Sequence, residues 1–261
     1  MADDAVLVER LGHIMVVTLN RPEAHNAVNS TVSRLVGGAL EQAQHDDSIW
    51  VVIIAGSGPT FCAGADLKAL RAGERIDAPG RESWGFAGFM RHHISKPTIS
   101  AVGGAALGGG MEIALASDLV VAARNASFGL PEVRRGLIAG AGGAFRLPRQ
   151  IPGKIAMELL LTGRSLSAEQ AHRLGLVNVL AEERQALPRA IELAEQIAGN
   201  APLAVQASKR VARSIVGGRI EDEDSAWALS DAELSTLRGT RDMREGISAF
   251  AERREPVWTA T

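Results

Sequence analysis

Two glutamates, Glu112 and Glu132, lie 20 residues apart (132 minus 112) beside turns built of glycine and alanine. Glu112 has apolar neighbours, which predicts that it is buried, and a buried glutamate is uncommon unless it has a partner or a task. Glu132 follows Pro131 in a loop, where a surface glutamate would be unremarkable by itself. As a pair, one acid and one base beside free backbone N–H groups are suited to proton transfer at a carbon next to a carbonyl.

Two glycine and alanine turns could supply those N–H groups. They are 61–68, which reads FCAGADLK, and 103–112, which reads GGAALGGGME. Glycines that open a helix cost roughly 0.5–1 kcal/mol each relative to alanine, so either a ligand approaches the backbone closely or the helix packs tightly. Neither turn contains GxGxxG or a phosphate-loop lysine. Asp66 is predicted to cap a following helix, and an ordinary strand-to-helix turn is the alternative interpretation of 61–68.

Strands that alternate with helices are predicted to position these turns, which indicates an α/β fold. A capped helix is expected over Asn29–His45, because apolar residues recur there at helical spacing. An apolar helix is expected over Leu107–Ser117, following the glycine-rich turn. Runs of apolar, often β-branched residues without alternation indicate a sheet covered on both faces. The predicted strands are His13–Asn20, Trp50–Ala55, Thr98–Val102 and Asp118–Ala123.

The pattern becomes helical after about residue 181. We therefore predict an α/β core over 1–195 and a helical region over 196–261, whose apolar stripes must be buried on the core or on a neighbouring subunit. Breaks are expected at Gly199 and at Gly217-Gly218. The predicted helices are Glu182–Ala198, Pro202–Val216, Glu221–Leu237 and Thr240–Arg254.

Composition excludes several classes of function. The 261 residues carry 28 basic and 30 acidic side chains, a formal charge of −2, so there is no basic excess for nucleic acid or an anionic membrane. The chain has no tyrosine, which rules out a tyrosine acid, and its single cysteine, Cys62, rules out an intrachain disulfide. An acidic N-terminus without a leader, and no apolar run of membrane-spanning length, predict a cytoplasmic protein.

The histidines do not indicate a metal site. Six are scattered along the chain without ligand spacing. The adjacent His92 and His93 are more typical of a helix surface than of a metal centre. We expect no metal and no redox cofactor.

Six segments, taken in order, resemble the enoyl-CoA hydratase (crotonase) family over nearly the full length of the chain. Each is weak alone, and together they are specific. They are NRPEAHNAVN (20–29), FCAGADLK (61–68), GGAALGGGMEIALASD (103–118), ASFGLPEVRRGL (126–137), AGAGGAFRLPR (139–149) and LTGRSLSAEQAHRLGLVN (161–178).

The resemblance implies a spiral core of strand–strand–helix turns and a C-terminal helical region that forms trimers, which often pair into hexamers. The substrate would be an acyl-CoA thioester, with CoA as part of the substrate and no separate cofactor. The amides of Ala65 and Gly109 would form the oxyanion hole, and Gly140 would lie near the reacting water. Segments that match the CoA site contain Ala24, Ala63, Asp66, Leu67 and Lys68.

By the same resemblance, Glu112 and Glu132 match both catalytic glutamates of hydratases. The expected reaction is syn hydration of a trans-2-enoyl-CoA, in which Glu112 deprotonates water and Glu132 protonates C2. Members that only move a double bond usually keep just the later carboxylate. A dehydratase of a specialised 3-hydroxyacyl-CoA, such as a carnitinyl-CoA-like one, keeps both and stays open as an alternative.

Two further points stay open from sequence. Some family members bind RNA without catalysis, although the net charge and the few lysines disfavour this, and the arginines at 134, 135, 146 and 149 are interpreted as helix-surface groups or contacts to CoA phosphates or a neighbouring subunit. The segment 72–89 matches the region that lines the acyl end. Its aromatic residues Trp84, Phe86 and Phe89 either border the pocket or pack in the core, and we expect packing for at least one.

Overall fold

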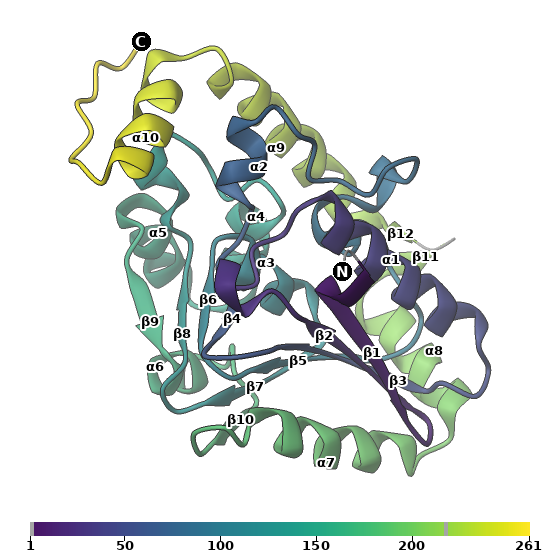
Figure 1. Ribbon diagram of the computed structural model, residues 1–261. Helices are drawn as coiled ribbons and strands as arrows, with labels where there is room; N and C mark the ends of the chain where they lie inside the picture. Colours follow the sequence, from purple (N-terminus) through teal and green to yellow (C-terminus); the bar gives the residue numbers. More distant parts are fainter. Residues whose placement is uncertain (1–2, 217–218) are drawn as a thin grey trace.

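The computed structural model describes residues 3–216 and 219–261, so the predicted break at Gly217-Gly218 lies outside the described residues. The chain forms two β-sheets covered by helices (Figure 1). In Figure 1 the larger sheet lies between α1 above it and α7 below it. The predicted α/β class is confirmed.

The larger sheet has six strands in the order β1-β2-β3-β5-β7-β10. β1 and β2 pair antiparallel, and the following neighbours pair in parallel. Strands β3 and β5 are buried along almost their whole length, as their unbroken apolar runs predict. β1 was not predicted, and five of its six residues are exposed. The strands are β1 (Val6–Leu11), β2 (Ile14–Leu19), β3 (Val51–Gly56), β5 (Thr98–Val102), β7 (Leu119–Ala123) and β10 (Val179–Ala181).

The smaller sheet explains why the chain winds as a spiral. Its order is β4-β6-β8-β9, and the consecutive pairs β3/β4, β5/β6 and β7/β8 each give one strand to the large sheet and the next to the small one. The expected spiral of strand–strand turns is therefore confirmed. The smaller sheet contains β4 (Thr60–Cys62), β6 (Ala105–Leu107), β8 (Ser127–Gly129) and β9 (Ser165–Ser167), and a separate hairpin pairs β11 (Ile215–Val216) with β12 (Arg219–Ile220).

The helices begin where the sequence provides caps. The side chain of Asn29 accepts a hydrogen bond from the Val32 amide and starts α1, as predicted. The α-helices are α1 (Ser30–His45), α2 (Leu67–Arg71), α3 (Gly109–Ala116), α4 (Gly143–Gln150), α5 (Gly153–Thr162), α6 (Ala168–Arg173), α7 (Ala186–Ala198), α8 (Pro202–Ala212), α9 (Asp224–Leu237) and α10 (Arg241–Glu252). The 3₁₀ helices are η1 (Asp3–Ala5), η2 (Pro22–Ala24), η3 (Glu82–Trp84), η4 (Phe86–Gly88), η5 (Pro131–Arg135) and η6 (Glu221–Glu223).

Helix α7 covers the open face of the large sheet. Its buried alanines, Ala190 and Ala194, join a core cluster with residues of β2, β3, β5 and β7. The larger core cluster fills the space on the other side of the sheet. The predicted division of the chain between residues 195 and 196 falls inside α7, three residues before its end (198 minus 195), and stays a prediction.

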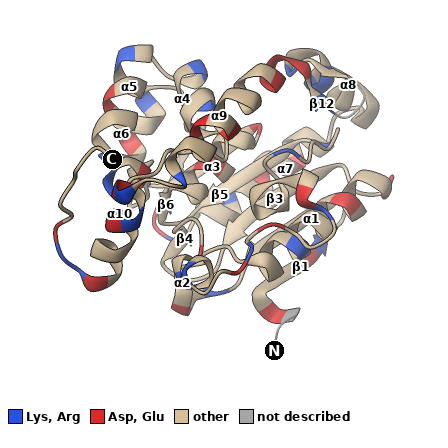
Figure 2. Ribbon diagram, turned by 90° about the horizontal axis from the view of Figure 1, so that it is seen from above, with Lys and Arg blue, Asp and Glu red and all other residues tan. Residues whose placement is uncertain are grey.

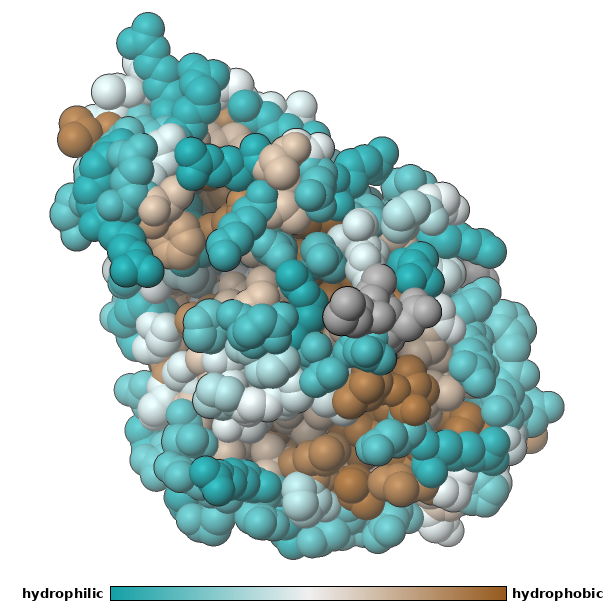
Figure 3. Space-filling view, in the orientation of Figure 1, coloured by the Kyte–Doolittle hydropathy of each residue, from teal (hydrophilic) through white to brown (hydrophobic). Residues whose placement is uncertain are grey.

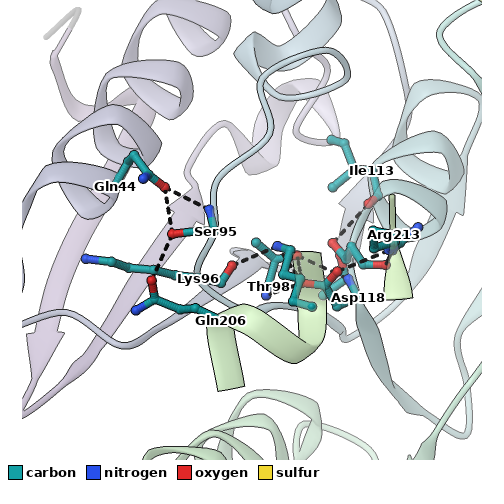
Figure 4. Close-up of polar contacts among 11 residues, drawn as sticks. Gln44, Ser95, Lys96, Thr98, Ile113, Asp118, Gln206 and Arg213 are labelled. Carbon is teal, nitrogen blue, oxygen red and sulfur yellow. Dashed lines mark hydrogen bonds and ion pairs between the residues drawn. The ribbon is translucent and has the colours of Figure 1, made fainter. Parts of the chain in front are cut away.

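Helix α8 is attached to the core by charged groups (Figure 4). Asp118, which precedes β7, accepts from Lys209 Nζ at 2.7 Å and from Arg213 Nε at 3.3 Å. Burial raises the pKa of Asp118, but Lys209 and Arg213 outweigh it and hold the pKa below its usual range. Helix α8 ends at Ala212 rather than at the expected residue 216, because Ile215–Val216 pairs as strand β11.

Helices α9 and α10 pack on the core of their own chain. Gly246 of α10 sits directly on the backbone of Arg135, where an added Cβ would lie 2.3 Å from the carbonyl carbon. Leu234 of α9 lies against Gly140 in the same way. In Figures 1 and 2 α9 lies beside α4. The sequence predicts that the apolar stripes of these helices are buried on the core or on a neighbouring subunit, and the core therefore buries part of them.

The surface view shows apolar area in the lower part of the face in Figure 3, over the region of β1, where Leu7, Val8 and Leu11 are exposed. Among the described residues, no helix is long and apolar enough to cross a bilayer. The same residues contain no group of three or more histidine, cysteine or acidic side chains placed to hold a metal ion.

Candidate active site

A cavity of about 1200 Å³ lies between the core and the C-terminal helices, and Glu112 and Glu132 both reach its wall. This volume is slightly above the usual range of small-ligand sites, about 300–1,000 Å³, and suits a long ligand. The residues come from α2, α3, η5, α9 and α10 among other elements, so segments far apart in the sequence meet here.

Most of the residues expected at the site lie on this wall. Together with both glutamates, it contains Ala63, Ala65, Leu67, Gly109 and Gly140. Ala24, Asp66 and Lys68 do not line it. Ala24 ends η2, next to His25, whose carbonyl accepts a hydrogen bond from the Ala63 amide. Lys68 is exposed on α2.

The side chain of Asp66 caps the start of helix α2, as predicted. Its Oδ1 accepts hydrogen bonds from the amides of Lys68 and Ala69, and its Oδ2 pairs with Arg21 at 2.9 Å. Burial raises the pKa of Asp66, but the Arg21 hydrogen bond and the amides outweigh it and lower the pKa overall. Asp66 therefore anchors the start of α2 to the segment that contains Arg21.

Asp66→Ala is expected to lower the free energy of unfolding by about 1–2 kcal/mol, because it removes the cap of α2 and leaves Arg21 without its carboxylate. Asp66→Ser keeps a capping oxygen but no charge, and should lose about half as much. Urea denaturation of the three proteins measures the difference. Equal losses in the two variants would show that the cap contributes nothing.

The backbone N–H groups of Ala65 and Gly109 are not used by the β-bridge and the helix to which these residues belong. Val28 pairs with the Gly64 carbonyl and the Asp66 amide, so the Ala65 N–H between them faces the other way. Gly109 is the first residue of α3, where an N–H has no partner within the helix. Among the described residues, no acceptor is paired with either amide.

The two turns that hold these amides touch each other. Gly64 has φ +96°, a left-handed conformation that favours glycine, and an added Cβ would lie 3.0 Å from the Gly109 nitrogen. A Cβ on Gly110 would lie 2.0 Å from the Cys62 carbonyl oxygen. Tight packing of α3 against the 61–68 turn thus accounts for part of the glycine run.

Glu112 is buried on α3, with 3% of its surface exposed, as predicted. The amide of Gly143, at the start of α4, donates to Glu112 Oε1 at 2.9 Å. Burial raises the pKa of Glu112 to about 7, and the Gly143 amide and Arg146 oppose this rise because they stabilise the carboxylate. Glu112 is therefore the carboxyl group of the pair with a fixed donor for its ionised form.

Glu132 has less support for its ionised form, which comes from its own backbone amide and the charge of Arg135. It lies on η5, and its buried Oε2 has no hydrogen-bond partner among the described residues. Its Oε1 lies beside Gly108, where an added Cβ would be 3.2 Å away. Burial, followed by the charge of Glu112, raises the pKa of Glu132 to about 8. When the pair holds one proton, the amide donor on Glu112 and the unpaired Oε2 of Glu132 favour that proton on Glu132.

Comparison with known proteins identifies the family. The model of the enoyl-CoA hydratase/isomerase family matches residues 9–261. The chain belongs to the enoyl-CoA hydratase/isomerase family. A carnitinyl-CoA dehydratase of Salmonella agona is 40% identical over 262 residues, 98% of each chain.

Solved structures of this family superpose over almost the whole chain. A carnitinyl-CoA hydratase from Mycobacterium avium is 52% identical, with a TM-score of 0.98 and 99% of each chain covered. An enoyl-CoA hydratase from Mycobacterium tuberculosis is 49% identical, with a TM-score of 0.77, covering 99% of this chain and 100% of the other. The chain is thus a crotonase-family hydratase or dehydratase by these likenesses.

Within this family site, Arg146 corrects a prediction. It is not a helix-surface group but is 2% exposed, and its guanidinium donates to Glu223 Oε1 and Oε2 at 2.9 and 2.6 Å and to the Met90 carbonyl at 2.9 Å. Arg146 belongs to α4, whose Gly143 amide holds Glu112. The Arg146–Glu223 pair thus joins α4 to the C-terminal region, and no local pattern indicates it because its partners are 77 residues apart.

Two other predictions about this region are resolved. His92 and His93 do not lie on a helix: His92 stacks on Trp84, and His93 lines the cavity. Phe86 and Phe89 are both buried in the core cluster, which confirms the expected packing of at least one aromatic residue. Phe86 and Trp84 also line the cavity.

Proposed function

We propose that this chain catalyses the reversible addition of water to a trans-2-enoyl-CoA, giving a 3-hydroxyacyl-CoA. The observation that carries the proposal is the contrast within the buried glutamate pair: Glu112 has an amide donor for its ionised form, and Glu132 has an orphaned oxygen that favours its protonated form. Hydration needs one base and one acid on the same side of the double bond, and this pair supplies both.

The geometry supports one assignment of roles. The amides of Ala65 and Gly109 bind the thioester oxygen and stabilise the enolate that develops there, and one such donor contributes about 10²–10³ in rate. Glu112 takes a proton from water as its oxygen attacks C3. Glu132 gives its proton to C2. Dehydration follows the same steps in reverse, with each residue in the opposite role.

The CoA end of the ligand is proposed to lie near α2. The expected contacts there are Ala24, Ala63, Asp66, Leu67 and Lys68, and Gly140 is the expected neighbour of the water. Arg71 and Arg238 line the same cavity and have no carboxylate partner among the described residues, so they are suited to the phosphates of CoA.

Dehydration of a specialised 3-hydroxyacyl-CoA is the second candidate. Relatives with 40% and 52% identity are named carnitinyl-CoA dehydratase and carnitinyl-CoA hydratase. Both glutamates serve this reaction equally well, because it is the reverse of hydration on a different acyl group. The two candidates therefore differ in the acyl end of the substrate and not in the catalytic pair.

We also propose that copies of this chain assemble as trimers or hexamers. Leu161, Leu203, Val211 and Leu229 are each more than 60% exposed, and burial between copies would remove this apolar surface from water. Sedimentation of the purified chain tests the state directly.

Loss of enoyl absorbance across a panel of trans-2-enoyl-CoA thioesters tests the proposed function. We expect turnover by the native chain and turnover at least about 10³-fold slower by the Glu112→Gln/Glu132→Gln double variant. Salt-sensitive retention of RNA without turnover of any thioester would instead support the non-catalytic role.

The pH profile provides a separate prediction. The active form for hydration has Glu112 ionised and Glu132 protonated, so activity should fall below about pH 7 as Glu112 gains a proton and above about pH 8 as Glu132 loses one. Because the two groups titrate as a pair, the two limbs of the kcat/KM profile belong to both residues together. A kcat/KM profile that stays flat from about pH 5 to about pH 10 would contradict the acid–base pair.

A further inference from the structure

Arginine side chains of the protein already lie over two of the aromatic rings on the cavity wall. Arg91 and Arg146 lie over the Trp227 ring, with their guanidinium carbons 4.1 and 5.2 Å from its centroid. Trp84 stacks on His92 at 4.5 Å with an interplanar angle of 3°, and Arg81 lies over it at 5.3 Å. A quaternary ammonium is recognised by free aromatic faces, so these rings are poorly placed to bind one.

The third aromatic ring is also engaged. Phe86 is 8% exposed and packs against Gly109, where an added Cβ would lie 2.3 Å from its ring. None of the three rings on the described wall therefore offers an unobstructed cage for a cation.

The acidic side chains on the wall are also paired. Outside the catalytic glutamates, they are Asp77, Glu82, Asp224 and Asp231. Each aspartate has an arginine of the same wall as its partner: Arg75 at 3.4 Å, Arg219 at 3.0 Å and Arg91 at 2.6 Å, respectively. Glu82 is exposed and accepts a hydrogen bond from the Gly80 amide. An incoming cation thus meets arginines wherever it meets these aspartates.

One neutral polar group on the wall is available instead. His93 lines the cavity, and its side chain has no hydrogen-bond partner among the described residues. Burial and the charge of Arg146 lower the pKa of His93 to about 4, so its imidazole is neutral and offers one N–H donor and one acceptor nitrogen. The Met90 carbonyl, three residues before His93, accepts a hydrogen bond from Arg146 of α4, the helix whose Gly143 amide donates to Glu112. The segment that contains Met90 and His93 therefore lines the cavity beside the element that holds Glu112, where we expect the acyl end.

We propose that the acyl end of the cavity selects an uncharged chain that bears a hydroxyl or keto oxygen, which His93 binds by a hydrogen bond, and that it rejects a quaternary ammonium. This rests on the proposed function and specifies its substrate class. It separates this chain from relatives whose names refer to carnitinyl-CoA, since the carnitinyl group carries a trimethylammonium.

The charge is tested with two thioesters of the same shape. One is 4-(trimethylammonio)but-2-enoyl-CoA, and the other is its carbon isostere, 5,5-dimethylhex-2-enoyl-CoA. We expect kcat/KM for the neutral isostere to exceed that for the cation by about tenfold or more, because the cation loses hydration without gaining a free aromatic face. Equal values, or a preference for the cation, would overturn the proposal.

The role of His93 is tested by comparing hex-2-enoyl-CoA with its 5-hydroxy and 6-hydroxy derivatives. We expect the native chain to prefer one hydroxylated substrate by about three- to tenfold in kcat/KM, the effect of one hydrogen bond. His93→Leu should bring this ratio to about one, and His93→Gln should keep part of it. Because a ratio is compared, a general loss of activity in a variant does not imitate the result.

The outcomes separate this proposal from the proposed function. Turnover of hex-2-enoyl-CoA with no preference for either hydroxylated substrate, or with a preference that survives in His93→Leu, leaves hydration standing and overturns the role of His93. No turnover of any enoyl-CoA overturns the proposed function, and this proposal with it.

Discussion

Replacing Glu132 by glutamine should lower kcat for hydration about 10³-fold, because the amide has the shape of the acid but no proton to deliver to C2. Glu112→Gln should cost a similar factor through loss of the base. The double variant should be only slightly slower than either single one, since residues that act on one water and one substrate are not additive. Stopped-flow loss of enoyl absorbance measures all three. Glu183→Gln, on an exposed glutamate, is the matched control.

A stability measurement separates this result from misfolding. The pKa of Glu132 is raised in the folded chain, so the folded state holds its proton up to about pH 8, whereas the unfolded chain releases it near the ordinary value. The native chain therefore loses stability as the pH rises from the unfolded pKa to the folded one. Glu132→Gln does not titrate, and its melting temperature should exceed that of the native chain at pH 8. A lower melting temperature at that pH would contradict the buried, protonated state.

Removing Glu223 should destabilise the protein by about 3–5 kcal/mol, because Arg146 would remain as a buried charge without its carboxylate. The α4 start would also lose a support, so the Gly143 amide would hold Glu112 less firmly and kcat should fall. Chemical denaturation of Glu223→Ala measures the first effect and the enoyl assay the second.

Two controls make this prediction specific. Asp224→Ala removes the neighbouring exposed pair with Arg219 and should change stability by about 0–1 kcal/mol. The double variant Arg146→Met/Glu223→Leu should recover most of the stability, since both charges are gone. If the single and double variants were equally unstable, the loss would come from packing and not from the unpaired charge.

Local signals allowed much of the fold and of the site to be predicted. The cap at Asn29, the buried run of β3 and the apolar setting of Glu112 each depend on neighbours in sequence, and the structure agrees with them. Strand β1 escaped prediction because its exposed residues show no burial pattern.

The missed features depend on contacts between distant segments. Arg146 looks like a surface residue of a helix until Glu223 is placed against it. The state of His93 likewise follows from a wall assembled from several elements, and the stacking of Trp84 and Trp227 under cations requires their partners' positions. No spacing along the chain encodes these arrangements.

Because α9 and α10 line the same cavity as Glu112 and Glu132 of their own chain, we expect each copy of this protein to hold its own complete site. In an assembly that contains native and variant chains, each chain should therefore act independently of its neighbours. When native chains are refolded together with Glu132→Gln chains, specific activity is expected to fall in direct proportion to the mutant fraction. A variant chain should neither raise nor lower the activity of the native chain beside it. A curved dependence of specific activity on the mutant fraction would mean that a neighbouring chain contributes residues to the site.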